Sequence, residues 1–221
     1  MGRKRSAESR PGRREPSRQR ASTFPSPCGE ARFAAIPSAM PYDPLPDLTA
    51  MSLAEIAEAV EARRLPPVET WNPSETADSH MRIAADGTWF HDGRPIARPA
   101  MVRAFASLLV RDEAGRHWLV TPECRQSIEV EDAAFHAVEL RAEGDALAFR
   151  LNTDELVVAG PDHPLRAAGD PEVPAIYLAV RRGCEARLNR STYLQLVEHA
   201  LAQGPELTVA SQGATFALRP A

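Results

Sequence analysis

Apolar and polar residues alternate over much of the chain after position 80, and this period of two predicts short β-strands joined by tight turns. Two such runs, over 81–84 and 88–91, flank Asp86-Gly87, which predicts a hairpin because both residues tolerate a positive φ. A second Asp-Gly pair follows at 92–93. We expect further strands over 95–97, 118–121, 127–130, 134–141, 146–151, 156–158 and 175–180.

Two segments have the helical period instead. The first opens at Pro99, because proline suits the first turn of a helix. Its apolar residues recur at helical spacing, at Met101, Val102, Phe105, Leu108 and Leu109. The second covers 191–202, with Ser191 as the expected N-cap. A further helix is predicted over 52–64, which begins with a capping box.

The segments that precede the first two helices share a pattern of strand, glycine turn, short loop and arginine. Aligning Gly93 with Gly183 places Arg98 opposite Arg190 across a two-residue insertion. A repeated unit of this kind indicates duplication. The sequence therefore predicts an α+β fold of two related mixed halves, each with antiparallel strands and one main helix. The halves are expected over 71–124 and 125–221, after a tail over 1–46 and a helix with its linker over 47–70.

The N-terminal tail differs from the rest in composition. Residues 1–46 hold eight of the 20 prolines and show no sustained apolar period, so we expect disorder. The first 20 residues carry eight basic residues against two acidic ones, and because the whole chain has a net charge of −4, the rest carries −10. Binding to single-stranded nucleic acid requires aromatic residues among the basic ones, and this basic cluster contains none. We expect a solvated tail, or an extension ahead of a start at Met40 or Met51.

Cysteine usage and hydropathy restrict the compartment. Cys28, Cys124 and Cys184 are too few and too far apart for a disulfide framework, and no CxxC pair offers a zinc or redox site. No stretch approaches the ~20 apolar residues of a membrane helix. We therefore expect a cytoplasmic protein with neither a membrane nor a nucleic acid as its partner.

Candidate binding chemistry rests on arginine. The sequence lacks both familiar phosphate loops, G-x-x-x-x-G-K-[ST] and G-x-G-x-x-G, so a nucleotide would need arginine side chains. The candidates lie at predicted element ends, at Arg98, Arg111, Arg187 and Arg190. Alternatively, each is a surface residue or the ion-pair partner of Glu131 or Asp132. Thr121 is expected to hydrogen-bond the ligand, and Tyr193 to offer an apolar or stacking wall.

Three acidic residues, Glu129, Glu131 and Asp132, crowd the end of one predicted strand. We favour pairing with arginines across the contact between the halves, which brings Glu131 and Asp132 into the expected binding site. The alternative is an acid and base pair. The six histidines show no metal-ligand spacing, so we predict no metal site, and no sequence feature identifies a catalytic residue or a cofactor.

The run from Met81 to Arg98 resembles the signature of a bacterial family known as domain of unknown function 1285. The likeness continues over 108–113, 119–122 and 128–139 and resumes at 186–190. The resemblance implies a two-part α+β protein with a duplicated core and a C-terminal half superficially similar to a pleckstrin-homology fold. It also implies a ligand pocket between the parts, a nucleotide-like ligand and a role in signalling.

The chain departs from the family pattern in two places. Residues 73–80 stand where the family tends to carry a Cys-Gly stretch, and Cys124 and Cys184 occupy positions that are more usually aliphatic. A catalytic cysteine is therefore not expected.

The residues and the resemblance together predict a non-enzymatic protein. It would bind a small anionic, nucleotide-like ligand at the interface of its two halves, with a role in signal transduction. Two other hypotheses stay open. One is a protein–protein interaction module with no small ligand, and the other is a hydrolase or transferase that uses Glu131 and Asp132.

Overall fold

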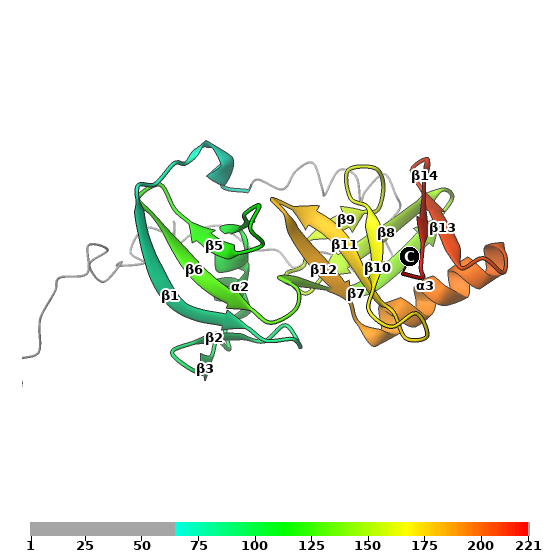
Figure 1. Cartoon of the computed structure of the whole chain (residues 1–221), viewed down its shortest axis with the longest axis horizontal. Helices are drawn as coiled ribbons and strands as arrows, with labels where there is room; N and C mark the ends of the chain where they lie inside the picture. Colours follow the sequence, from blue (N-terminus) through cyan, green and yellow to red (C-terminus); the bar gives the residue numbers. More distant parts are fainter. Residues whose placement is uncertain (1–64, 221) are drawn as a thin grey trace, which may run out of the picture.

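The computed structural model describes residues 65–220, which form two β-sheets placed next to each other along the long axis of the molecule (Figure 1). Each of these sheets has six strands, and a separate two-stranded sheet completes the described part. The α+β fold class is confirmed. The tail predicted over 1–46 and the helix predicted over 52–64 lie outside the described residues.

The first half begins with a strap, residues 65–74, which contains a 3-10 helix over Val68–Thr70. Its sheet has the order β3-β2-β1-β6-β5-β4, in which β1 and β6 are parallel and the other neighbours are antiparallel. The elements are β1 (Glu75–Ile83), β2 (Trp89–His91), β3 (Arg94–Pro95), α2 (Pro99–Ala106), β4 (Leu109–Arg111), β5 (His117–Val120) and β6 (Cys124–Val130).

The second half has the sheet order β10-β11-β12-β7-β8-β9, in which β12 and β7 are parallel. Its helix α3 packs against β7, and neither helix within residues 65–220 has the length and apolar character needed to cross a bilayer. The elements are β7 (Phe135–Glu143), β8 (Ala146–Leu151), β9 (Leu156–Val158), β10 (Leu165–Ala168), β11 (Ala175–Arg181), β12 (Cys184–Leu188), α3 (Arg190–Gln203), β13 (Thr208–Ser211) and β14 (Ala214–Ala217).

The two large sheets have the same construction when β1 to β6 are matched with β7 to β12. A parallel pair of strands forms the centre of each, and antiparallel strands extend it on both sides. The match extends to single hydrogen bonds. The N–H of Glu131 donates to the carbonyl oxygen of Ile83, and the N–H of Asn189 donates to that of Ala137, each over 3.0 Å. The predicted division into two related halves is therefore confirmed.

The residue alignment behind that prediction is nevertheless wrong. Gly93 lies in the β2–β3 turn and Gly183 in the β11–β12 turn, and these turns occupy different places in the matched sheets. Likewise, α2 connects β3 to β4, whereas α3 follows β12. A hairpin followed by an amphipathic helix is a common local pattern, so it recurs here without structural equivalence.

Two expectations at helix ends also need correction. α2 stops at Ala106, and Leu109, expected on its apolar stripe, pairs with Leu119 between β4 and β5. Asn189, rather than Ser191, caps α3, because its side-chain oxygen accepts the N–H of Thr192 over 2.9 Å.

The boundary between the sheets lies later in the chain than expected. β6 pairs with β1 and β5, so residues 124–130 belong to the first sheet. Residues 131–134, called the linker below, then lead into β7. The parallel pairing of β1 with β6 joins segments that are distant in sequence, and no local pattern encodes such a pairing.

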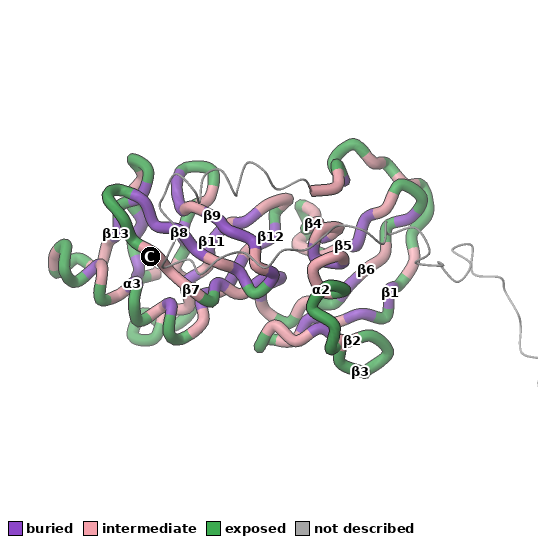
Figure 2. The backbone as a smooth tube through the Cα atoms, turned by 180° about the vertical axis from the view of Figure 1, so that it is seen from behind, coloured by how far each residue is buried: buried purple, intermediate pink, exposed green. Residues whose placement is uncertain are grey.

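One hydrophobic core continues through both halves, and Figure 2 shows buried backbone along the strands of each. In the first half, the Trp89 ring stacks on Phe105 of α2 with centroids 6.4 Å apart. In the second half, Phe135 and Phe149 are fully buried. Full burial of a large apolar side chain contributes about 1.5–3 kcal/mol. This shared core holds the two sheets together and fixes the geometry of their junction.

Candidate functional site

The β11–β12 turn of the second half reaches the first half. The backbone oxygen of Arg182 in this turn accepts the N–H of Arg111, at the end of β4, over 2.9 Å. Gly183 follows with a φ of +75°, and a Cβ atom there would lie 2.7 Å from the carbonyl oxygen of Arg111. Both the backbone conformation and the close approach therefore require glycine at this position.

Arg182 also holds the strap. Its guanidinium donates to the carbonyl oxygens of Pro66 over 2.6 Å and Ser107 over 2.7 Å, and it pairs with Glu69. The Arg182 side chain is only 7% exposed. The hydrogen bond from Arg182 holds the pKa of the Glu69 carboxyl below its ordinary value. One side chain of the second half thus joins the end of α2 to the strap.

A buried ion pair adds to the junction. Arg181 pairs with Glu155, and its guanidinium also donates to the carbonyl oxygen of Ala106 over 2.9 Å. The two side chains are 11% and 8% exposed. Arg103 of α2 pairs with Asp154 over 3.1 Å. The β8–β9 turn, which carries Asp154 and Glu155, is thereby tied to the first half.

The β1–β2 turn makes a separate contact with the second half. A Cβ atom on Gly87, whose φ is +84°, would lie 2.9 Å from Cδ2 of His136 and 3.2 Å from Nδ2 of Asn152. The Asn152 side-chain oxygen accepts the N–H of His136 over 3.1 Å. Burial lowers the pKa of the His136 ring, which favours its neutral form. Steric fit, rather than charge, determines this contact.

A cavity of about 220 Å³ lies at the same junction. The residues that line it include Arg111 and His117 of the β4–β5 hairpin, Asp132, Ala133 and Ala134 of the linker, and Glu185 of β12. Because the lining comes from both halves and from the linker, an occupant would touch all three.

The two carboxylates of the cavity wall already have partners. Asp132 accepts hydrogen bonds from Arg187 over 2.5 Å and from the Tyr177 hydroxyl over 2.7 Å. Glu185 pairs with Arg166 over 2.9 Å. Burial alone would raise the pKa of the Asp132 carboxyl, but the hydrogen bonds from Tyr177 and Arg187 outweigh it and lower the pKa. Asp132 therefore stays ionised at neutral pH with its charge compensated.

Arg111 brings an uncompensated positive charge to the cavity. Its exposed side chain forms no ion pair and no side-chain hydrogen bond with another residue of the described range 65–220. His117 lies directly opposite on β5. Burial and the charge of Arg111 lower the pKa of the His117 ring, which favours its neutral form. The cavity thus combines a free guanidinium with a neutral imidazole.

The linker adds backbone donors. Ala133 and Ala134 are buried, at 3% and 2% exposed, yet their N–H groups find no acceptor among the described residues. Buried backbone N–H groups in proteins are nearly always hydrogen-bonded, to protein or to ordered water. The cavity is therefore lined by a free guanidinium and by two residues whose backbone N–H groups have no acceptor in the described part of the chain.

Comparison with protein families identifies the family of the chain. The model for the N-terminal domain of DUF1285, a domain of unknown function, matches residues 66–133. The model for the C-terminal domain of DUF1285 matches residues 134–218. The chain belongs to the DUF1285 family. The resemblance stated from the run at Met81 to Arg98 is thereby confirmed.

Two solved DUF1285 family structures are similar to this chain. One, from Silicibacter pomeroyi DSS-3 at 2.50 Å resolution, is 39% identical with a TM-score of 0.62, over 77% of this chain and 96% of that one. The other, from Shewanella baltica OS155 at 1.40 Å, is 23% identical with a TM-score of 0.46, over 53% of this chain and 90% of that one. Comparison with curated proteins gave no match.

In this member of the DUF1285 family, several predicted site residues gather at the junction. Arg111 and Asp132 line the cavity, and Arg187 lies behind its wall as the partner of Asp132. Glu131 belongs to the linker but points elsewhere, because it pairs with Arg82 and accepts the N–H of Ala85 over 2.9 Å. Glu131 and Asp132 both pair with arginines, but only Asp132 pairs with an arginine of the second half, Arg187. Arg82, the partner of Glu131, lies in β1 of the first half, so the expected pairing across the halves is absent for Glu131.

The remaining predicted residues lie outside the cavity lining. Arg98 is the exposed N-cap residue of α2, and Thr121 closes the β5–β6 turn through hydrogen bonds with Cys124. Arg190 lines a shallow depression at the start of α3, and Tyr193 packs half-buried against the core. The two arginines aligned by sequence therefore do not converge. Within residues 65–220, no group of His, Cys, Asp and Glu is arranged to hold a metal ion.

Proposed function

We propose that the protein binds a small anion with a phosphate group in the junction cavity, and that this binding serves signal transduction. The observation that carries the proposal is the guanidinium of Arg111, which stands at the cavity wall without an acidic partner in the described chain. A planar guanidinium matches phosphate oxygens in a two-point contact. The buried N–H groups of Ala133 and Ala134 supply further donors of the kind that surround bound anions.

The volume of the cavity limits the size of the ligand. Pockets for drug-sized ligands have volumes of about 300–1,000 Å³, and this cavity has about 220 Å³. A phosphate group fits within it, whereas the nucleoside of a nucleotide would extend beyond it. A phosphate monoester is therefore favoured over a ligand recognised through its base. We place this function in the cytoplasm, because three cysteines far apart in the sequence form no disulfide framework and suit a reducing compartment.

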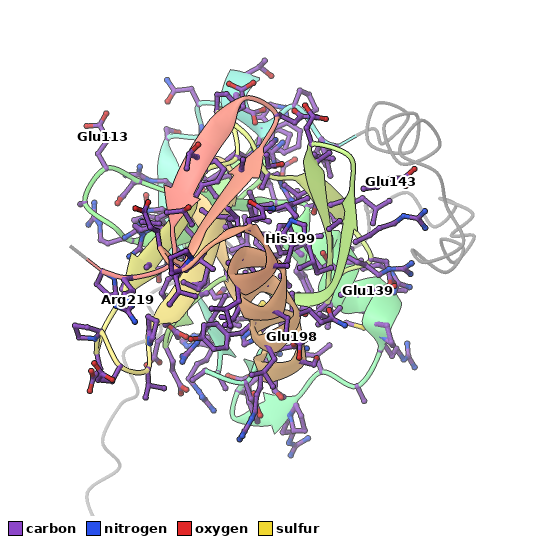
Figure 3. All side chains as sticks on the ribbon, turned by 90° about the vertical axis from the view of Figure 1, so that its right-hand side faces the viewer. Glu113, Glu139, Glu143, Glu198, His199 and Arg219 are labelled. Atoms are coloured by element: carbon purple, nitrogen blue, oxygen red, sulfur yellow. The ribbon has the colours of Figure 1, made fainter. Side chains whose placement is uncertain are left out.

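Thermal unfolding of the full chain with inorganic phosphate, pyrophosphate or AMP tests the proposal, against sodium chloride at equal ionic strength. A ligand at 100 times its Kd stabilises the folded state by about 2.7 kcal/mol, so we expect a rise in Tm of several degrees. Arg111→Gln should abolish the rise. Arg219→Gln is the matched control, because Arg219 is exposed, lies beyond β14 and does not line the cavity (Figure 3).

Two results would contradict the proposal. An unchanged Tm with all three phosphate compounds would show that the protein does not bind phosphate. An equal rise in Tm for Arg111→Gln would show that phosphate binds elsewhere. AMP should bind within about tenfold of inorganic phosphate, a difference of less than about 1.4 kcal/mol. A much tighter AMP complex would contradict the argument from size.

A protein-interaction module is the second candidate, and one observation favours it. Leu194 and Leu201, seven residues apart on α3, are 49% and 57% exposed, and Figure 3 shows the neighbouring Glu198 and His199 on this helix. Such a surface on the half expected to resemble a pleckstrin-homology fold would bind an apolar partner segment. The double variant Leu194→Ser/Leu201→Ser should then lose a co-purifying protein while it keeps the response to phosphate.

The acid and base alternative has less support. Both Glu131 and Asp132 are engaged by arginines, through Arg82 and Arg187. For Asp132, the hydrogen bonds from Tyr177 and Arg187 lower the pKa of the carboxyl, which suits it poorly as a general acid near neutral pH.

A further inference from the structure

The β11–β12 turn contacts both the strap and Arg111, a residue that lines the cavity. On one side, the Arg111 backbone is bonded to Arg182 and in van der Waals contact with Gly183, while the Arg111 side chain lines the cavity. On the other side, the Arg182 guanidinium donates to Pro66 of the strap and pairs with Glu69. A single hydrogen bond of 2.9 Å therefore separates the residue that faces the ligand from the residue that holds the strap.

The strap depends on few other polar contacts. Within the described structure, the other hydrogen bonds of its residues are local, from Val68 to Pro66, from Thr70 to Pro67 and from Trp71 to Val68. Its apolar contacts form a small cluster in which Val68 packs with Trp118 and Val120. The strap residue Trp71 packs against this cluster, and so does Leu108, which also contacts the main core. Segments with few buried contacts open at low free-energy cost. Arg182 is thus the principal polar tie between the strap and the body.

β4 connects the cavity to the contact between Arg182 and the strap. It is a three-residue edge strand of the first sheet, and Arg111 is its last residue. Gly183 leaves no free space against the Arg111 carbonyl, since a Cβ atom there would approach to 2.7 Å. Fixing the Arg111 side chain on an anion therefore restricts the strand end to which Arg182 is bonded.

We infer that an anion in the cavity strengthens the hold of Arg182 on the strap, so that occupancy of the cavity controls how firmly the strap is held. This inference rests on the proposed function. The change in the strap would be the effect that anion binding has on the rest of the protein. By thermodynamic reciprocity, loosening the strap must weaken the binding of the anion by the same factor by which the anion steadies the strap.

Hydrogen exchange of the full chain, read by mass spectrometry on peptides that cover 65–74, tests the inference with inorganic phosphate as the probe. We expect phosphate to slow exchange of the Thr70 and Trp71 amides by about 5- to 150-fold, the usual range of coupling between two sites. In Arg182→Gln, the strap should exchange rapidly with or without phosphate, and the Kd for phosphate should rise by the same factor.

A milder variant guards against misfolding of Arg182→Gln, whose side chain is buried. Glu69→Gln removes a carboxylate whose side chain is 61% exposed and leaves the contacts of Arg182 with Pro66 and Ser107 in place. It should reduce the effect of phosphate on strap exchange without abolishing it. Arg219→Gln, remote from both cavity and strap, should behave as the unmodified chain.

The outcomes separate the two proposals. Phosphate binding with slower strap exchange, lost in Arg182→Gln, supports the inference. Phosphate binding with unchanged strap exchange overturns the inference and leaves the proposed function intact. Failure of phosphate to bind overturns the proposed function, and the inference falls with it.

Discussion

The chain leaves the first sheet after β6 and the second sheet after β12 at equivalent positions, but it continues differently from each. After β12, Asn189 caps α3 by accepting the N–H of Thr192. After β6, the equivalent residue Glu131 turns towards Arg82 and the N–H of Ala85 instead. By the same count, Ala134 stands in the place of Thr192, and its N–H has no acceptor within residues 65–220.

The difference shows how a duplicated fold acquires a site. In the second half, a short polar side chain satisfies the backbone, and a helix of 14 residues begins. In the first half, the same exit lacks this cap, and the chain passes directly into the next sheet with buried donors unpaired. The cavity lies at this exit, where the two copies differ, and not where they agree.

The largest test of the comparison concerns the β8–β9 turn and its equivalent, the β2–β3 turn. Glu155→Ala would remove the carboxylate that pairs with the buried guanidinium of Arg181, so we expect the free energy of unfolding to fall by about 3–5 kcal/mol. Arg94→Ala, in the exposed β3, should change it by less than about 0.5 kcal/mol. Urea denaturation measures both. Equal losses would show that the β8–β9 turn does not hold the halves together.

An intermediate effect is expected at the turns β1–β2 and β7–β8. Gly87 and Gly144 both have positive φ, at +84° and +59°, so alanine is strained at either position. Only at Gly87 would the new Cβ atom also meet His136, whereas nothing lies within 4 Å of it at Gly144. Gly87→Ala should therefore cost about 1–3 kcal/mol more than Gly144→Ala in the same denaturation experiment. If the two variants lose the same free energy of unfolding, His136 and Asn152 move aside at little cost to accommodate the new Cβ atom.

The smallest effect is expected at the two exits. Asn189→Ala removes the cap of α3 and should lower the free energy of unfolding by about 1 kcal/mol. Glu131→Ala removes a half-exposed ion pair, which contributes about 0.2–1 kcal/mol. The helical signal in circular dichroism should weaken in Asn189→Ala alone. Loss of helical signal in Glu131→Ala would contradict the account of that exit.

Local sequence patterns predict the turns and the longer strands of this fold. Asp86-Gly87 forms a turn between β1 and β2, and the strand expected over 156–158 has those bounds in the structure. The pattern does not predict β4, β10, β12, β13 and β14, which have three to five residues, although it predicts β9, which has three. So few alternating positions give a weak signal that identifies only some of the short strands. Leu109 is an example of an error of this method. Its spacing from the apolar residues of α2 predicts that it belongs to the helix, but the helix ends at Ala106.

The candidate site is predicted in part for the same reason. Arg111 and Asp132 stand at ends of elements, where chain direction changes and side chains are free to converge. His117 begins β5 and Glu185 lies within β12, and only the packing of β4 against β12 brings them together. No local signal in the sequence distinguishes them from other strand residues. Arg98 and Arg190 were aligned by a local pattern that the sheet order does not follow.

The contact between Gly183 and Arg111 has a consequence for solubility. β4 ends its sheet, and an open edge offers unpaired backbone groups to any other extended chain. The Arg182 oxygen occupies the N–H of Arg111, and the turn that carries it crowds the neighbouring carbonyl. The second half thus covers the end of this edge at Arg111, and we expect this contact to limit edge-to-edge pairing of two copies there.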